Sequence, residues 1–374
     1  MKKRNLSRSA LMAGCVLLLI VAVLGGLTWY IARQEKINQA LRVAIEQTNV
    51  DSVARLLKQG ADPNTLYRPQ SGSIWQTLWR RMQHTGAQAA AENAPNPIQY
   101  TLQTYMNPGL FASRPENAEP SFRIIRLLIE AGASAKVTAP MSASEKEKTS
   151  NLLSFSIVYL NISSFKEDML RFLLQQGVDV DGKEGTGESP LYEAACIQDG
   201  DEGSVKILLD AGADVNHVSS EGTALEAASY YSSPEVVGWL LDRGAHVNTA
   251  PVPGERRYRT ALMEVCERMN TAKAALLLAH GANIDAQDNE GNTALMHVCA
   301  IWEPDGKPSE LIRFLLAYHP RLNIKNHDGQ TALAILIAAN KDADENYSDT
   351  AHLAYNKRRD AELVRVLRQA GATL

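Results

Sequence analysis

The 374-residue sequence has few cysteines, few aromatic residues and no excess of positive charge. Only 4 residues are cysteine, which excludes a fold held together by a dense disulfide framework. Aromatic residues make up 6%, which favours close helical packing of small side chains over an aromatic-rich β-sandwich. The formal net charge of −4 argues against a protein built mainly to bind nucleic acid.

The sequence also lacks the short motifs of common enzymes. The glycines at 185 and 187 are not followed by the Gly-Lys-Ser/Thr of a phosphate-binding loop, and neither Gly-x-Ser-x-Gly nor His-Glu-x-x-His occurs. Residues 285–290 are acidic but lack the spacing of a calcium loop. His297 and Cys299 are two residues apart, so they face different sides of a helix and do not suit zinc. We therefore expect no catalytic residue, no cofactor and no metal.

One long uncharged stretch lies near the N-terminus. Residues 10–32 form 23 consecutive positions without a charged side chain, ending near Trp29 and Tyr30. At about 1.5 Å per residue a helix of this length reaches roughly 35 Å, enough for a hydrocarbon core of about 30 Å. Residues 1–9 are basic, so the positive-inside rule predicts a cytoplasmic leader. The prediction is a single-pass inner-membrane anchor with the rest of the chain in the periplasm.

Two alternatives to an uncleaved anchor remain open. A cleaved signal peptide needs small residues at positions −3 and −1, and residues 23–28 offer no clean pair. Residues 12–15 resemble a lipobox, but the apolar core follows Cys15 when it should precede it. The remainder of the chain, from Arg33 onward, has 34 basic and 42 acidic residues and is therefore mildly acidic.

A phrase of two leucines, two variable residues and Gly-Ala recurs along the chain. It is complete at 208–216 (LLDAGADVN) and at 240–248 (LLDRGAHVN). Successive glycines from Gly132 to Gly281 are 45, 35, 32 and 37 residues apart. The full series of phrase positions is Gly60, Gly132, Gly177, Gly212, Gly244, Gly281, His319 (in the place of glycine) and Gly371.

A second phrase, Ser/Thr-Pro/Ala-Leu, precedes each later copy of the first. It begins at Ser189, Thr223, Thr260, Thr293 and Thr331. Ser or Thr there predicts a helix N-cap, because the hydroxyl accepts a backbone N–H that the helix leaves unsatisfied. The glycine about 20 residues later predicts a left-handed residue at the end of a second helix. Together the phrases predict a helix, a turn, a second helix and an extended finger.

Two phrases recurring in fixed order resemble the ankyrin repeat. The resemblance implies an all-α solenoid of about eight helix-turn-helix repeats with short β-hairpin fingers, preceded by the transmembrane helix. The repeats cover residues 37–374, with insertions at 65–95, 107–120 and 342–359. One repeat cannot bury its apolar stripe alone, so neighbours stack into one elongated domain.

In the ankyrin family the fingers and the outward positions of the first helices line a groove. Matching those positions assigns binding residues on four first helices: Tyr192, Glu193, Glu226, Glu264 and His297. The longest finger adds Arg256, Arg257 and Tyr258, residue types that suit protein contacts.

Sulfur-containing side chains of the repeats are expected to pack inside. Met263 and Met296 are predicted to be packing residues more than contact residues. Cys266 and Cys299 occupy equivalent positions of neighbouring first helices, about 8–10 Å apart, too far for a disulfide. With Cys196 they are predicted to be small buried hydrophobic residues.

The predicted function is protein binding by a membrane-tethered ankyrin domain that is not an enzyme. The chain resembles ankyrin proteins of the bacterial envelope, among them the immunity proteins of type VI secretion. That resemblance implies a protein partner such as a secreted lipase-type effector, the inner membrane as the site of attachment, and no nucleic acid. The alternative is a scaffold or stress-protection partner of an envelope enzyme.

Overall fold

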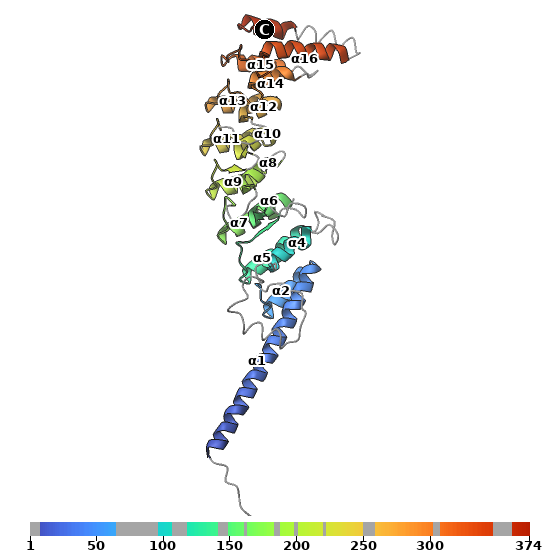
Figure 1. The fold of residues 1–374 in the computed structure, drawn as a ribbon, viewed down its shortest axis with the longest axis vertical. Coiled ribbons are helices and arrows are strands. Elements are labelled where there is room, and N and C mark those ends of the chain that lie inside the picture. The colour runs from blue at the N-terminus through green and yellow to red at the C-terminus, as the bar shows by residue number, and fades with distance from the viewer. Residues whose placement is uncertain are drawn as a thin grey trace, which may run out of the picture. The chain divides into compact units, whose positions relative to one another are not determined.

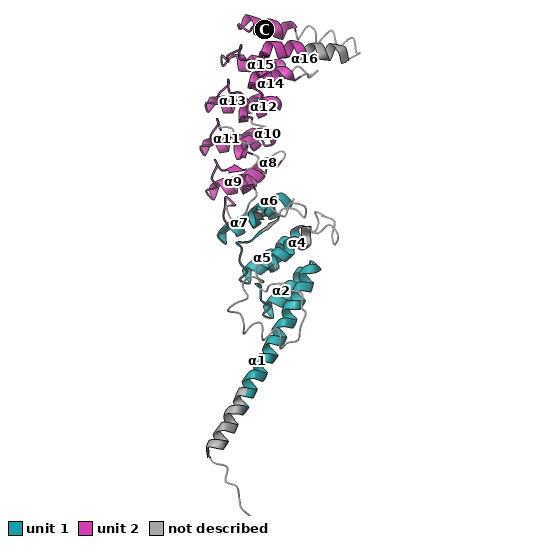
Figure 2. Cartoon of the chain, in the orientation of Figure 1, with its two compact units in different colours: residues 1–178, 184–186 teal, residues 179–183, 187–374 magenta. Residues whose placement is uncertain are grey.

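The structure is a computed structural model in which two compact units are distinguished (Figure 2). Unit 1 comprises residues 1–178 and 184–186, and unit 2 comprises residues 179–183 and 187–374. The structure describes residues 8–64, 96–106, 118–140, 149–160, 163–182, 188–197, 201–219, 222–249, 259–301, 307–346 and 361–374.

Among its described residues, unit 1 has three helix pairs and one hairpin (Figure 1). Its elements are α1 (Arg8–Glu46), α2 (Val50–Lys58), α4 (Pro97–Met106), α5 (Ala118–Glu130), β1 (Thr138–Pro140), β2 (Thr149–Asn151), α6 (Leu152–Tyr159) and α7 (Ser163–Gln175). The strands pair antiparallel, with Thr138 opposite Asn151. The pairs α1/α2, α4/α5 and α6/α7 correspond to the first three predicted repeats.

Helix α1 has two parts of different character. Its last turns belong to the first repeat, because Leu41 and Ile45 are each 1% exposed. Earlier apolar residues of the same helix, such as Val23 at 60% and Trp29 at 65%, are exposed. Over the described residues, no helix combines the length and the apolar character needed to cross a membrane. The side chains of residues 8–17, 19 and 20 lie outside the described part, so the anchor stays a prediction.

Unit 2 continues the helix pairs. Its elements are α8 (Pro190–Cys196), α9 (Glu202–Asp210), β3 (Val218–Ser219), β4 (Gly222–Thr223), α10 (Ala224–Tyr231), α11 (Pro234–Asp242), α12 (Ala261–Glu267), α13 (Thr271–Ala279), α14 (Ala294–Ala300), α15 (Lys307–Leu316) and α16 (Ala332–Asn346). A last helical segment covers residues 361–369. First helices α8, α10, α12, α14 and α16 pack in succession, with the second helices beside them (Figure 1).

The predicted helix starts are confirmed at all five phrase positions. Each side-chain hydroxyl accepts a hydrogen bond, 3.2–3.4 Å long, from the backbone N–H three residues later. The hydroxyl-bearing residues are buried, from 0% exposed at Thr331 to 5% at Thr293. In unit 1 asparagine replaces Ser or Thr: Asn96 starts α4 and Asn151 starts α6. Each cap therefore satisfies one backbone N–H that the first turn of its helix leaves without a partner.

The predicted helix ends are confirmed as well. Every residue of the glycine series has a positive φ, from 55° at His319 to 102° at Gly371. The ends use paired reverse bonds: Gly281 N–H donates to Leu278 O (3.1 Å) and Ala282 N–H to Leu277 O (2.9 Å). At His319 the second bond is impossible, because the next residue is Pro320 and proline has no N–H.

A ladder of asparagines joins the finger bases of successive repeats. Asn248 Nδ2 donates to Gly281 O (2.9 Å), and Asn248 Oδ1 accepts from the N–H of Asn283 (2.7 Å). The same pair of bonds links Asn216 to the following repeat. At Asp285 the rung has only an acceptor, which takes the N–H of Arg321. The last residue of the recurring phrase therefore fixes the spacing between repeats.

The predicted insertions and cysteines are placed as follows. Residues 65–95 lie outside the described residues, whereas α5 and α16 extend into the segments predicted as insertions 107–120 and 342–359. Cys266 and Cys299 are 0% exposed, as predicted for small hydrophobic residues. Cys196 is half-buried, because it lies one position later in its helix than the other two.

Candidate interaction surface

The predicted groove residues lie on consecutive first helices of unit 2, but in two different registers. Tyr192 and Glu226 are third in their helices, whereas Glu193, Glu264 and His297 are fourth. Since adjacent helical positions are about 100° apart, the two sets face different directions. The predicted groove residues therefore fall into two groups, one at the third helix position and one at the fourth.

The third position completes the start of the helix. Glu226 Oε2 accepts the N–H of Thr223 (2.8 Å), and Thr223 Oγ1 accepts the N–H of Glu226 (3.3 Å). The hydroxyl of Thr249 donates to the other carboxylate oxygen of Glu226. The capping box and the bond from Thr249 together use both carboxylate oxygens of Glu226 inside the fold.

Methionine occupies the same third position in the next two repeats. The sulfur of Met263 accepts the N–H of Thr260 at 3.4 Å, and Met296 does the same for Thr293. Met263 is 1% and Met296 2% exposed. The prediction that both methionines are packing residues is confirmed.

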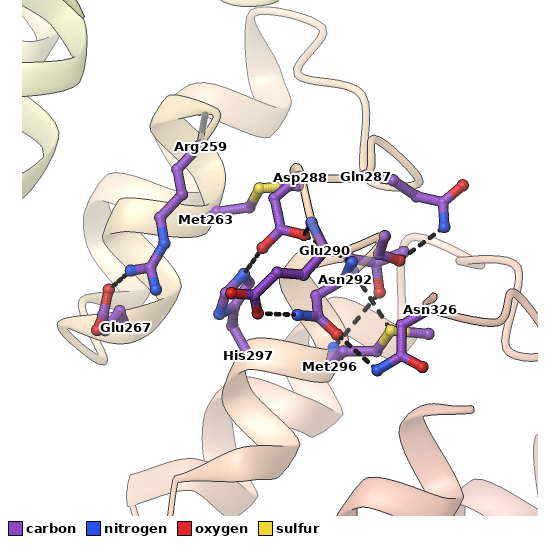
Figure 3. A network of polar contacts seen from close by, with 12 residues as sticks. Arg259, Met263, Glu267, Gln287, Asp288, Glu290, Asn292, Met296, His297 and Asn326 are labelled. Carbon is purple, nitrogen blue, oxygen red and sulfur yellow. Dashed lines mark hydrogen bonds and ion pairs between the residues drawn. The ribbon is translucent and has the colours of Figure 1, made fainter. Parts of the chain in front are cut away.

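His297 supports a finger. Its Nε2 lies 2.8 Å from Asp288 Oδ2, with the side chains 12% and 6% exposed (Figure 3). Asp288 Oδ1 accepts the N–H groups of Glu290 (2.9 Å) and Asn292 (2.7 Å). Burial lowers the pKa of His297 below its ordinary value, and the hydrogen bond to Asp288 opposes that shift. The pair therefore ties the finger turn to helix α14 and is occupied inside the fold.

The finger that His297 supports is bonded to the next finger. Asn326 Nδ2 donates to Asn292 Oδ1 at 3.0 Å (Figure 3). Gln287 Nε2 donates to the carbonyl of Lys325 at 3.1 Å. These bonds link repeats six and seven on the finger side.

The remaining predicted binding residues are either half-buried or outside the described part of the chain. Tyr192, Glu193 and Glu264 are half-buried on α8 and α12. The finger residues at 256–258 lie outside the described part of the chain. Their assignment as binding residues stays a prediction.

One turn beyond the predicted residues lies an aromatic and cationic cluster that the sequence reasoning missed. The guanidinium carbon of Arg268 is 3.6 Å from the centre of the Tyr230 ring. The rings of Tyr230 and Tyr231 meet edge to face, with centroids 4.5 Å apart. Tyr231 is 42% exposed and Arg268 is also exposed. We call Tyr230, Tyr231 and Arg268 the Tyr-Arg cluster.

The Tyr-Arg cluster lies on the outward stripe of the first helices, defined as their fourth, seventh and eighth positions. Tyr230 and Tyr231 are seventh and eighth in α10, and Arg268 is eighth counted from the start of α12. Residues three and four apart share a helix face, so the cluster continues the face on which Glu264 and His297 lie. That spacing is the signal in the sequence that could have revealed it.

A buried lysine lies directly behind the cluster. Lys273 Nζ on α13 donates to the carbonyls of Ala228 (3.1 Å) and Ser229 (3.0 Å) in the last turn of α10. Lys273 is 3% exposed. Burial, and after it the positive charge of Arg268, lowers the pKa of Lys273 to about 8. The lysine therefore satisfies the carbonyl end of α10 across a repeat boundary.

The metal-ligating and thiol groups of the described residues are placed as follows. Within the described ranges no group of three or more His, Cys, Asp or Glu side chains is placed to hold a metal ion. Burial raises the pKa of the Cys266 and Cys299 thiols to about 12. Both therefore stay protonated near neutral pH and are poor nucleophiles and poor metal ligands.

Part of this chain is similar to known ankyrin-repeat proteins. The family model "Ankyrin repeats (3 copies)" matches residues 160–251 and 252–326. Human "Ankyrin repeat and KH domain-containing protein 1" is 38% identical over 109 residues, 29% of this chain and 4% of that protein. The vaccinia virus (strain Ankara) "Ankyrin repeat protein B18" is 27% identical over 206 residues, 48% of this chain and 35% of that protein.

A third relative has a similar extent of match. The fowlpox virus (strain NVSL) "Putative ankyrin repeat protein FPV031" is 30% identical over 143 residues, 36% of this chain and 40% of that protein. The chain thus spans at most about two fifths of the length of these relatives. The likeness concerns the repeats.

Proposed function

We propose that this chain is an ankyrin-repeat protein and that the outward stripe of unit 2 binds another protein, without chemistry of its own. Ankyrin repeats are protein–protein interaction modules, and stacked repeats present an extended surface for that purpose. The observation that carries the proposal is the Tyr-Arg cluster, which exposes an aromatic ring and a guanidinium on this stripe.

The cluster has the properties of an energetic centre for binding. Tyrosine and arginine are enriched among residues whose truncation costs most at interfaces. Tyr231 is backed by Tyr230, and Tyr230 is covered by Arg268, so the three side chains are held in place before a partner arrives. Preorganisation of this kind reduces the entropy lost on binding. Glu226 and His297 are engaged inside the fold, which favours the cluster over them as the anchor.

The proposal includes attachment to the inner membrane with the repeats in the periplasm. It rests on the uncharged run at 10–32 and on the basic leader before it. The exposed apolar residues of α1 between Leu18 and Tyr30 are compatible with it. A reporter that is active only outside the cytoplasm, fused after Leu374, should be active. Activity of a cytoplasm-only reporter at the same place would contradict the orientation.

For the partner we propose a secreted toxin, with this chain as its immunity protein. The acidic body and the insertions between repeats support a dedicated inhibitor over a general scaffold. In cells that express a toxin-like product of a neighbouring gene, co-expression of this chain should restore growth. The Tyr231→Ala variant of this chain should not restore it. Glu235→Ala is the matched control, because Glu235 is exposed on the second helix α11. Binding of an envelope enzyme without protection would favour the scaffold instead.

A further inference from the structure

The charge of Arg268 is not neutralised by any carboxylate among the described residues. Its guanidinium carbon lies 3.6 Å from the centre of the Tyr230 ring. The neighbouring Glu267 is paired with Arg259 (Figure 3). Two other exposed arginines of unit 2 are paired with acidic residues: Arg243 lies 2.7 Å from Asp210, and Arg313 is paired with Glu362. Arg268 differs from these two in having the Tyr230 ring on one side and, among the residues that the structure describes, no paired carboxylate.

The fold does not need Arg268 to complete the adjacent helix end. Cations are favoured near helix C-termini because the last carbonyls lack partners inside the helix. In α10 the carbonyls of Ala228 and Ser229 already accept bonds from Lys273. The positive charge of Arg268 is then an addition to that of Lys273, and the two raise the local potential within an acidic chain.

A guanidinium stacked on a ring keeps its N–H groups in its own plane, at the edges of the stack. Those N–H groups form a fork whose geometry matches both oxygens of a carboxylate. The exposed ring of Tyr231 lies beside the fork and offers an apolar surface. Glu264 and Glu267 are on the same helix as Arg268, and they disfavour a doubly charged phosphate more than a singly charged carboxylate.

We propose that Arg268 binds an aspartate or glutamate side chain of the protein partner, and that an apolar side chain next to it in the partner packs on Tyr231. This inference rests on the proposed function, because it names the chemistry that the interaction surface recognises. The guanidinium of Arg268 donates two parallel hydrogen bonds to the carboxylate of the partner. The apolar side chain of the partner contacts the ring of Tyr231.

The test is selection of a displayed random-peptide library on the full-length chain in detergent. We expect peptides selected by the unmodified protein to be enriched in Asp or Glu next to an apolar residue. Selection on Arg268→Glu should favour Lys or Arg at that place, by charge reversal. Arg243→Glu, which changes an exposed arginine on the second-helix side, should leave the acidic preference unchanged.

Affinity measurements with one selected peptide complete the test. Arg268→Gln should weaken its binding at least tenfold, and replacing the acidic residue by phosphoserine should not strengthen it. Selected peptides without enrichment in Asp or Glu would overturn the inference that Arg268 binds a carboxylate. So would a phosphoserine peptide that binds more tightly than the acidic one. Neither result would contradict the proposal that this surface binds a protein. Peptides that bind the Tyr231→Ala protein as tightly as the unmodified one would instead refute the proposed surface.

Discussion

The asparagine ladder predicts a specific loss of stability when one rung is cut. Asn248→Ala removes the donor to Gly281 O and the acceptor for the N–H of Asn283. A hydrogen bond contributes about 0.5–1.5 kcal/mol net, and both groups are exposed, so the free energy of unfolding should fall by about 1–2 kcal/mol. For a unit of this size, Tm should fall by about 2–4 °C for each kcal/mol.

A graded series separates the two bonds of that rung. Asn248→Asp keeps the acceptor and loses the donor, as the natural rung at Asp285 does, so its cost should be about half that of Asn248→Ala. His246→Ala is the control, because only the backbone of His246 takes part in the ladder. Thermal and urea unfolding followed by circular dichroism measure all three. The reasoning is refuted if Asn248→Ala has the same Tm and the same urea midpoint as His246→Ala.

Four further substitutions test the packing of the repeats and their buried polar groups. At Gly281, φ is +84° and an added Cβ would meet open space, so Gly281→Ala should cost about 1 kcal/mol from backbone strain alone. At Gly291 an added Cβ would lie 3.0 Å from the backbone of the next finger. Gly291→Ala should therefore lower the free energy of unfolding, measured in urea, by at least about twice as much. Equal costs would contradict the close approach of the fingers. The depressed pKa of Lys273, about 8 against about 10.4 when unfolded, means that the unfolded state holds more protons between these pH values. Stability relative to Lys273→Met should therefore rise with pH across that window; a flat difference would mean that the lysine is not desolvated. Cys299→Ser should cost about 1–3 kcal/mol by burying a hydroxyl, and the thiol of Cys299 should resist alkylation until the protein unfolds.

Local features of the repeats could be predicted from the sequence because their causes are local. A hydroxyl before Ala-Leu can satisfy the third N–H of the helix it precedes, and Thr293 does so. A glycine after a leucine-rich helix can adopt a positive φ, and Gly281 does so. Even the substitution at His319 keeps that conformation. Each of these outcomes depends on a few consecutive residues.

Features that depend on neighbouring repeats could not be predicted in the same way. The link from Lys273 to Ala228 joins residues 45 positions apart, and no spacing rule announces it. Likewise the pairing of His297 with Asp288 depends on how the finger folds back onto its helix. By contrast, the role of Glu226 was readable, since Thr-x-x-Glu is the signature of a capping box. Assigning Glu226 to the groove used helix periodicity and passed over that local signature.

The central claim, that the outward stripe of unit 2 is where a protein partner binds, has a direct test. A photoreactive aromatic amino acid placed at position 231 in the full-length chain, in its own cells, should crosslink to one discrete protein on illumination. The same amino acid at position 235, exposed on the second helix α11, should give no such product. Equal crosslinking at both positions, or a product at 235 alone, would contradict the claim.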